Sequence, residues 1–118
     1  MAEMVFNERA FYNHLGGDVE LGYEILKVYL VDAPDRLDSL KESVHSGDLD
    51  LIVKYSHALK GISATVRAEG IALLAEKVEL AARKGEVDVI RDYLPQVVGE
   101  LDNVLEAVRA HLSGNVAE

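Results

Sequence analysis

His57 is the residue of this sequence best placed to do chemistry. On a helix with about 100° between successive residues, those within about 60° of His57 are Asp50, Val53, Lys54, Lys60, Gly61 and Ala64. The larger apolar residues fall on the opposite side: Ile52, Tyr55, Leu59, Ile62 and Val66. The imidazole is therefore predicted on the outer face of the helix, where it can act as a nucleophile near neutral pH. A plain surface histidine is the alternative.

Two neighbours favour a functional histidine. Lys60 lies one turn after His57 on the same side and is a suitable point charge for phosphoryl oxygens. Gly61 lies in the middle of the helix, where glycine costs about 1 kcal/mol relative to alanine. Because Gly61 is on the outer face, we expect close approach of a partner there and not tight packing inside the protein. No acidic residue occurs between Leu51 and Ala68, so this stretch can receive an anionic group.

The run HALKGISA at positions 57–64 resembles the H-x-L-K-G-x-x-A signature of histidine-containing phosphotransfer (HPt) domains. The resemblance continues without a gap to Glu79, and more loosely the helix pattern fits from about residue 19 to 112. It implies that a receiver-domain aspartyl phosphate phosphorylates a ring nitrogen of His57 and that the group then passes to another receiver. The expected partners are response-regulator receiver domains, with a hybrid histidine kinase as a further candidate.

The same resemblance implies a phosphocarrier without catalysis of its own. The receiver is expected to supply the magnesium ion and the catalytic groups, so no cofactor is expected on this chain. Lys60 corresponds to the lysine that helps to hold the phosphoryl group, and Gly61 to the glycine that lets the receiver come close. Glu79 matches a position where the family commonly has glutamine, which orients the imidazole through its other nitrogen. A carboxylate could accept the ring N–H and raise imidazole basicity, and it could also repel the phosphoryl group.

Four further residues are predicted to contact the docking partner. Val53, Lys54 and Ala64 share the face of His57. Arg67 stands where the family usually has glycine. It is expected either to add positive charge near the site or to cap the C-terminus of the helix.

Five helices must position these residues. Glycine and aspartate pairs mark most of the helix ends, and the predicted helices span residues 8–15, 19–45, 48–66, 69–84 and 87–112. Four long helices with short connections predict an all-α, antiparallel up-down-up-down four-helix bundle with a short extra N-terminal helix. We assign residues 1–118 to a single HPt-like domain, with the bundle over about 19–112.

Two of the long helices contain proline. Apolar stripes run from Val19 past Pro34 in the second helix and from Val87 past Pro95 in the last. Because each stripe continues beyond its proline, we expect a bend or a collinear restart there and not a loop.

Composition narrows the function classes. The 118 residues suit one domain, and the absence of cysteine excludes disulfides, thiolate metal sites and cysteine nucleophiles. The formal net charge of −9 argues against nucleic acid and anionic membranes, which bind clustered lysine and arginine. Residues 1–4 do not begin a signal peptide, and no apolar run is long enough to span a membrane. A cytoplasmic monomer is expected.

The other histidines are assigned no chemical role. His14, His45 and His111 lie near predicted helix ends, where a cation is favoured. The spacing of Glu42 and His45 is that of carboxylate-bridged di-iron bundles, but those sites need a second such pair and two further inward glutamates. No metal is therefore expected.

Two other functions are typical of helical proteins with an exposed histidine. The dimerisation domain of a histidine kinase has an acidic residue directly after its histidine and a proline soon after, whereas Ala58 and Gly61 follow His57. A helical bundle that binds a signalling partner as an adaptor, with His57 never phosphorylated, has no such conflict with the sequence and remains the alternative.

Overall fold

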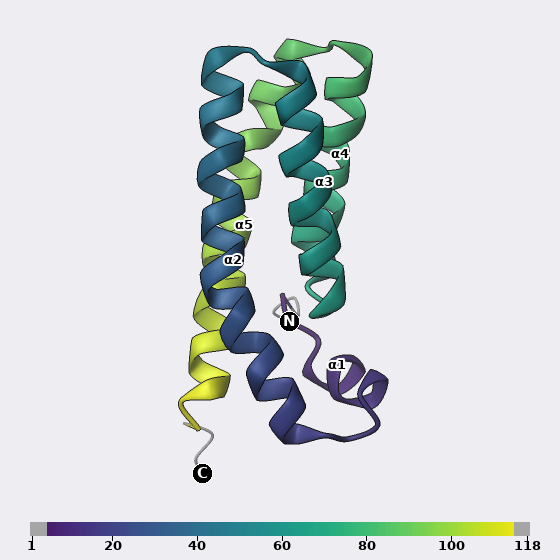
Figure 1. Cartoon of the computed structure of the whole chain (residues 1–118), viewed down its shortest axis with the longest axis vertical. Coiled ribbons are helices and arrows are strands. Elements are labelled where there is room, and N and C mark those ends of the chain that lie inside the picture. The colour runs from purple at the N-terminus through teal and green to yellow at the C-terminus, as the bar shows by residue number, and fades with distance from the viewer. Residues whose placement is uncertain (1–4, 115–118) are drawn as a thin grey trace.

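The computed structural model describes residues 5–114, which are helical apart from short connections. Residues 1–4, on which the expectation of no signal peptide rests, lie outside this range. The helices are α1 (Glu8–His14), α2 (Val19–Ser46), α3 (Leu49–Thr65), α4 (Glu69–Lys84) and α5 (Val87–Leu112). Figure 1 shows α2 to α5 running side by side with alternating direction, and α1 beside the beginning of α2. The predicted all-α bundle with a short extra helix is confirmed, and every helix end lies within one residue of its predicted position.

Local sequence explains where the long helices begin and end. The side chains of Asp18 and Asp48 each accept a backbone N–H three residues further on, which satisfies an otherwise unpaired donor at the start of α2 and α3. Gly47 and Gly85 follow α2 and α4 with φ of 76° and 72°, a left-handed conformation that suits glycine. Connections this short hold successive helices antiparallel and side by side.

The two prolines lie inside helices. α2 continues through Pro34 and α5 through Pro95, so the expectation that neither proline begins a loop is confirmed. Each proline lacks the N–H that would bond to the preceding turn. Figure 1 shows the first part of α2 leaning away from the axis of the rest of that helix.

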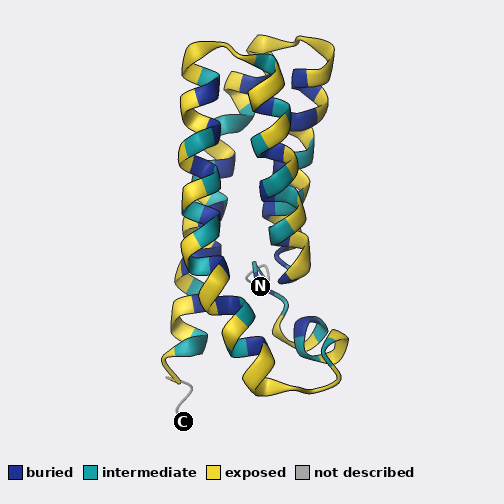
Figure 2. Ribbon diagram, in the orientation of Figure 1, coloured by how far each residue is buried: buried dark blue, intermediate teal, exposed yellow. Residues whose placement is uncertain are grey.

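The core lies along the inner faces of the four long helices (Figure 2). Its largest fully buried side chains are Phe11, Leu26, Leu40, Leu59, Ile71, Ile90, Leu101, Val66, Val78, Val97, Val104 and Val108. The predicted stripes were wrong at their first positions, because Val19 is 54% exposed and Val87 is 42% exposed. Each is the first residue of its helix, at an end of the bundle where the neighbouring helices give it little cover.

α1 closes one end of the bundle. Phe11 is almost fully buried, and the hydroxyl of Tyr12 forms a hydrogen bond of 2.5 Å with Nε2 of His111 on α5. Gly22 of α2 lets α1 come close, since a Cβ at that position would collide with the ring of Tyr12. Within residues 5–114, no helix combines the length and the hydropathy needed to cross a membrane.

Candidate functional site

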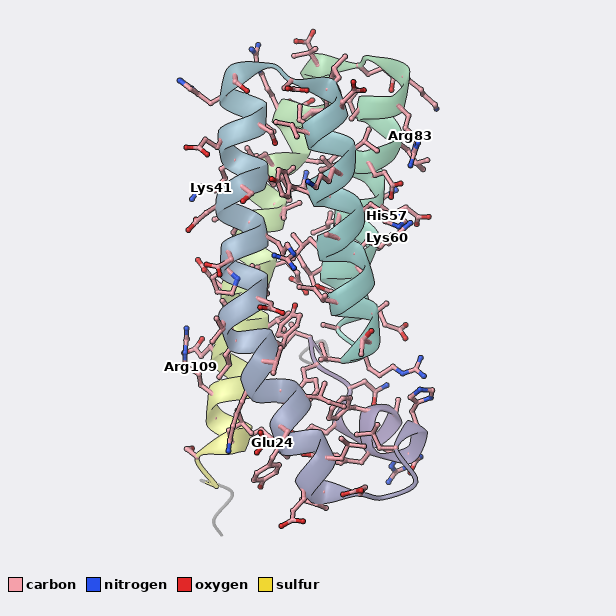
Figure 3. All side chains as sticks on the ribbon, viewed as in Figure 1. Glu24, Lys41, His57, Lys60, Arg83 and Arg109 are labelled. Carbon is pink, nitrogen blue, oxygen red and sulfur yellow. The ribbon has the colours of Figure 1, made fainter. Side chains whose placement is uncertain are left out.

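His57 stands on the outer face of α3, with 63% of its side chain exposed. Figure 3 shows it projecting from the bundle next to Lys60. The preceding residue, Ser56, points the other way and is fully buried, with its hydroxyl bonded to the carbonyl of Ile52 at 2.6 Å. The side chain of the next residue, His57, faces solvent. Its imidazole is therefore open to a partner, while its backbone belongs to a packed helix.

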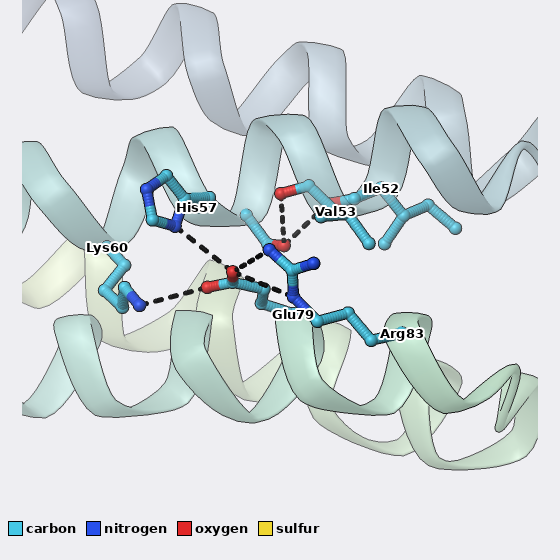
Figure 4. Close-up of polar contacts among 7 residues, drawn as sticks. Ile52, Val53, His57, Lys60, Glu79 and Arg83 are labelled. Atoms are coloured by element: carbon cyan, nitrogen blue, oxygen red, sulfur yellow. Dashed lines mark hydrogen bonds and ion pairs between the residues drawn. The ribbon is translucent and has the colours of Figure 1, made fainter.

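Glu79 on α4 holds one nitrogen of this imidazole. Its Oε2 lies 3.1 Å from Nδ1 of His57, and its side chain is only 5% exposed (Figure 4). An ionised carboxylate has no hydrogen to donate, so the hydrogen of this bond is on Nδ1. In the neutral form of the ring, the other nitrogen, Nε2, then has no hydrogen and has a free lone pair.

The Glu79 carboxylate carries two further contacts to cations. Nζ of Lys60 lies 3.1 Å from Oε1, and Arg83 binds Oε2 through Nη2 at 2.8 Å and Nε at 3.2 Å. Burial acts to raise the pKa of Glu79, but the hydrogen bonds from Arg83, the ion pair with Lys60 and the hydrogen bond from His57 outweigh it and hold the pKa below its ordinary value. The carboxylate is therefore ionised at neutral pH despite its burial.

The structure brings Lys60 and Gly61 next to His57, in different ways. Lys60 is 30% exposed and turns toward α4, where it pairs with Glu79. Gly61 faces open space, because a Cβ at that position would meet no atom within 4 Å beyond its own turn of helix. The packing explanation for this glycine is thus excluded within the described residues, and the roles of both residues in phosphoryl transfer remain predictions.

The four predicted docking residues do not all lie near the imidazole. Val53 is half-buried, Ala64 is exposed, and the ammonium of Lys54 lies 5.3 Å from the centre of the Tyr55 ring. Arg67 is ten residues after His57, about 15 Å along the helix axis at 1.5 Å per residue. It follows the last turn of α3 with φ of 63°, and its N–H bonds to the carbonyl of Ala64. Arg67 therefore ends the helix and does not border His57.

Sequence reasoning missed Arg83. Its contact with Glu79 is a salt bridge between residues four apart on one helix, with the acid on the N-terminal side. This is the favourable order for such a pair, so the spacing was a usable signal. The spacing alone does not connect Arg83 to His57, because the arginine lies 26 residues after the histidine.

The remaining histidines lie apart from this cluster. His14 and His45 are exposed near the ends of α1 and α2. His111 is largely covered, and besides Tyr12 it approaches Glu8 with 3.5 Å between Nδ1 and Oε1. Its position is that of a structural residue between α1 and α5, in keeping with the prediction.

The chain is similar to known phosphotransfer proteins along most of its length. The family model described as the Hpt domain matches residues 24–111. The phosphorelay intermediate protein rdeA of Dictyostelium discoideum is 24% identical over 101 residues, which cover 86% of this chain and 40% of that protein. The chain thus spans less than half the length of this relative.

Two solved structures have the same fold. Histidine-containing phosphotransfer protein B (HptB) from Pseudomonas aeruginosa PAO1 has a TM-score of 0.87 at 20% identity, with 95% of this chain and 97% of that chain covered. The HPT domain of a sensor hybrid histidine kinase from Shewanella has a TM-score of 0.83 at 20% identity, with 97% of both chains covered. Since the Hpt model matches most of the residues and the fold agrees along almost the whole chain, the chain belongs to the Hpt domain family of histidine-containing phosphotransfer proteins.

Proposed function

We propose that this phosphorelay intermediate accepts a phosphoryl group on Nε2 of His57 from the aspartyl phosphate of a receiver domain and passes it to another receiver. One observation carries the choice of atom: Nδ1 is held by the buried Glu79, which leaves Nε2 of an exposed ring as the nucleophile. The ammonium of Lys60 lies in the same cluster as His57, and its positive charge suits an incoming phosphoryl group.

The transfer step balances without a proton leaving the site. The lone pair of Nε2 forms a bond to phosphorus, the bond from phosphorus to the aspartyl oxygen breaks, and its electron pair leaves with the receiver's carboxylate. The ring then carries a positive charge, with its hydrogen still on Nδ1. The carboxylate of Glu79 at 3.1 Å stabilises that charge and keeps the ring in place.

As a member of the Hpt family the chain is a phosphocarrier and not a catalytic enzyme. His57 lies on an open helix face, so in-line geometry at phosphorus needs a second protein surface. We assign the divalent metal ion and the groups that stabilise the transferring phosphoryl to the receiver. Gly61 leaves space beside the imidazole for the receiver's backbone, with Val53, Lys54 and Ala64 as surrounding contacts.

A panel of phosphorylated receivers tests the proposal. The chain should become labelled with a phosphoryl group that is labile in acid and stable in base. His57→Gln should lose the label while its free energy of unfolding falls by at most about 1.5 kcal/mol, because the side chain is exposed and the contact at stake is its hydrogen bond to Glu79. His45→Gln, at another exposed histidine, is the matched control and should be labelled as the parent is.

Two results would reject the proposal. A label that persists in His57→Gln places the acceptor elsewhere. Stable binding of a phosphorylated receiver with no label on the parent would favour the alternative, an adaptor whose histidine is not phosphorylated.

A further inference from the structure

Lys60 does not point at the nitrogen that would carry the phosphoryl group. Its Nζ lies 3.1 Å from Oε1 of Glu79, on the side of the carboxylate away from the atom that holds His57. Figure 4 shows Lys60 and Arg83 reaching the same carboxylate from opposite sides. To hold phosphoryl oxygens on Nε2 of His57, the ammonium of Lys60 therefore has to turn at least some of its three N–H donors away from Glu79.

Such a move would normally be costly. Glu79 is 5% exposed, and a buried carboxylate that loses its cation leaves an uncompensated charge in a poorly solvated place. In an amide-bearing relative this problem does not arise, because a glutamine at this position has no charge to neutralise. The carboxylate of this chain creates the need for a second cation.

Arg83 supplies that second cation. It donates two hydrogen bonds to Oε2, from Nη2 at 2.8 Å and from Nε at 3.2 Å, and it comes from the same helix as Glu79. The guanidinium keeps its charge at any pH of interest, and two of its N–H groups converge on the one oxygen Oε2. With Lys60 and Arg83 both present, the cluster has one positive charge more than Glu79 needs.

We propose that Arg83 is a positioning residue that keeps Glu79 neutralised, so that Lys60 can move from Glu79 to the phosphoryl group on His57. This inference rests on the proposed phosphorylation of His57. No covalent bond changes in the exchange: Lys60 leaves Oε1, its ammonium meets the phosphoryl oxygens, and Arg83 stays on Oε2.

A double-mutant cycle separates this role from a direct one. Arg83→Gln should slow transfer from a phosphorylated receiver by about tenfold, whereas the same change in a Glu79→Gln background should slow it less than about twofold. Arg83→Lys should recover most of the rate, because a cation still reaches the carboxylate. Lys84→Gln is the matched control: it removes an exposed charge next in sequence that is not among the cations on Glu79, and its rate should equal that of the parent.

A second measurement requires no phosphoryl donor. The pKa of the Glu79 carboxyl, followed by carbon NMR, should rise in Arg83→Gln and stay unchanged in Lys84→Gln, since Arg83 is among the groups that lower it. The charged groups that contact Glu79 are His57 and Lys60 from α3 and Arg83 from α4. Far-ultraviolet circular dichroism and melting curves of each variant verify that it is folded.

These experiments distinguish failure of the proposed phosphorylation of His57 from failure of the inference about Arg83. If receivers label neither parent nor variants, the proposed function fails, and the Glu79 titration still decides whether Arg83 neutralises this carboxylate. If Arg83→Gln slows transfer equally with Glu79 and with Gln at that position, Arg83 acts directly on the phosphoryl group or the receiver, and the inference is wrong. A Glu79 pKa that does not rise in Arg83→Gln also overturns it.

Discussion

Glu79 Oε2 lies 3.1 Å from Nδ1 of His57, although the two residues are on different helices and 22 positions apart. A carboxylate that is almost wholly buried thus determines which nitrogen of an exposed imidazole keeps its hydrogen. The contact depends on the packing of α3 against α4. Ionisation of Glu79 therefore affects both the stability of the bundle at low pH and the reactivity of the exposed His57.

Glu79→Gln should make the bundle less sensitive to acid. The pKa of Glu79 is lowered in the folded protein, so its carboxylate contributes stability above the ordinary value of 4.5, and this contribution is lost as the pH falls through the folded-state pKa. The parent's free energy of unfolding should therefore fall more steeply than that of Glu79→Gln as the pH falls below 4.5. Urea unfolding at a series of pH values measures both slopes.

The control for that series is Glu76→Gln, one turn earlier on α4 and outside the cluster around Glu79. Its slope should follow that of the parent. Equal slopes for the parent and Glu79→Gln would show that His57, Lys60 and Arg83 do not stabilise this carboxylate in the folded state.

Lys60→Ala should slow phosphoryl transfer while the receiver still binds. A hydrogen bond to a charged group contributes about 1.5–3 kcal/mol, so loss of the ammonium from the phosphorylated state should slow transfer by at least about tenfold. Rapid-quench transfer kinetics and a binding titration with the unphosphorylated receiver measure the two effects separately. Lys41→Ala, on α2 away from the site (Figure 3), is the control; parental rates for both variants would show that Lys60 is only a structural partner of Glu79.

Gly61→Ala and Gly61→Leu should increase stability and reduce transfer. A Cβ at this position meets no atom within 4 Å beyond its own turn of helix, and replacing a glycine inside a helix contributes up to about 1 kcal/mol. The added atoms occupy the space through which a receiver would approach, so the transfer rate should fall further for Leu than for Ala. Thermal melting tests the expected gain in stability, and transfer kinetics test the expected loss of rate.

The matched control for this pair is Gly22→Ala. Its new Cβ would press on the ring of Tyr12 and push α1 from the bundle, so stability should fall by about 1–3 kcal/mol. A melting temperature that drops with side-chain size at position 61, as it should at position 22, would mean that Gly61 is packed against another part of the protein.

Arg67→Gly should raise the melting temperature. Arg67 is the residue of the described chain with a positive φ that is not glycine, and at φ 63° its side chain strains the backbone by about 1 kcal/mol. Glycine relieves the strain but adds freedom to the unfolded chain, so the net gain should be at most about 1 kcal/mol. Arg67→Ala keeps the strained backbone without the guanidinium and should not show this gain; a lower stability for Arg67→Gly would show that the arginine side chain holds the turn.

Much of the fold follows from local signals that the sequence carries. Aspartate caps and left-handed glycines act within one turn, so the positions of Asp18, Gly47 and Asp48 were enough to place helix ends within one residue. The outward direction of His57 and Gly61 follows from helical periodicity alone, because a stripe of apolar residues on one side leaves the other side to solvent.

Only the tertiary structure decided which partners these side chains have. Lys60 and His57 share a helix face, yet both turn to Glu79, because the register of α3 against α4 places a buried carboxylate between them and Arg83. Periodicity placed Val19 and Val87 on apolar stripes, but burial also needs a neighbouring helix long enough to cover them. The direction in which a side chain leaves its helix is set by that helix alone. Its contacts and its burial depend on where the neighbouring helices lie, and the packing of the whole core decides that placement.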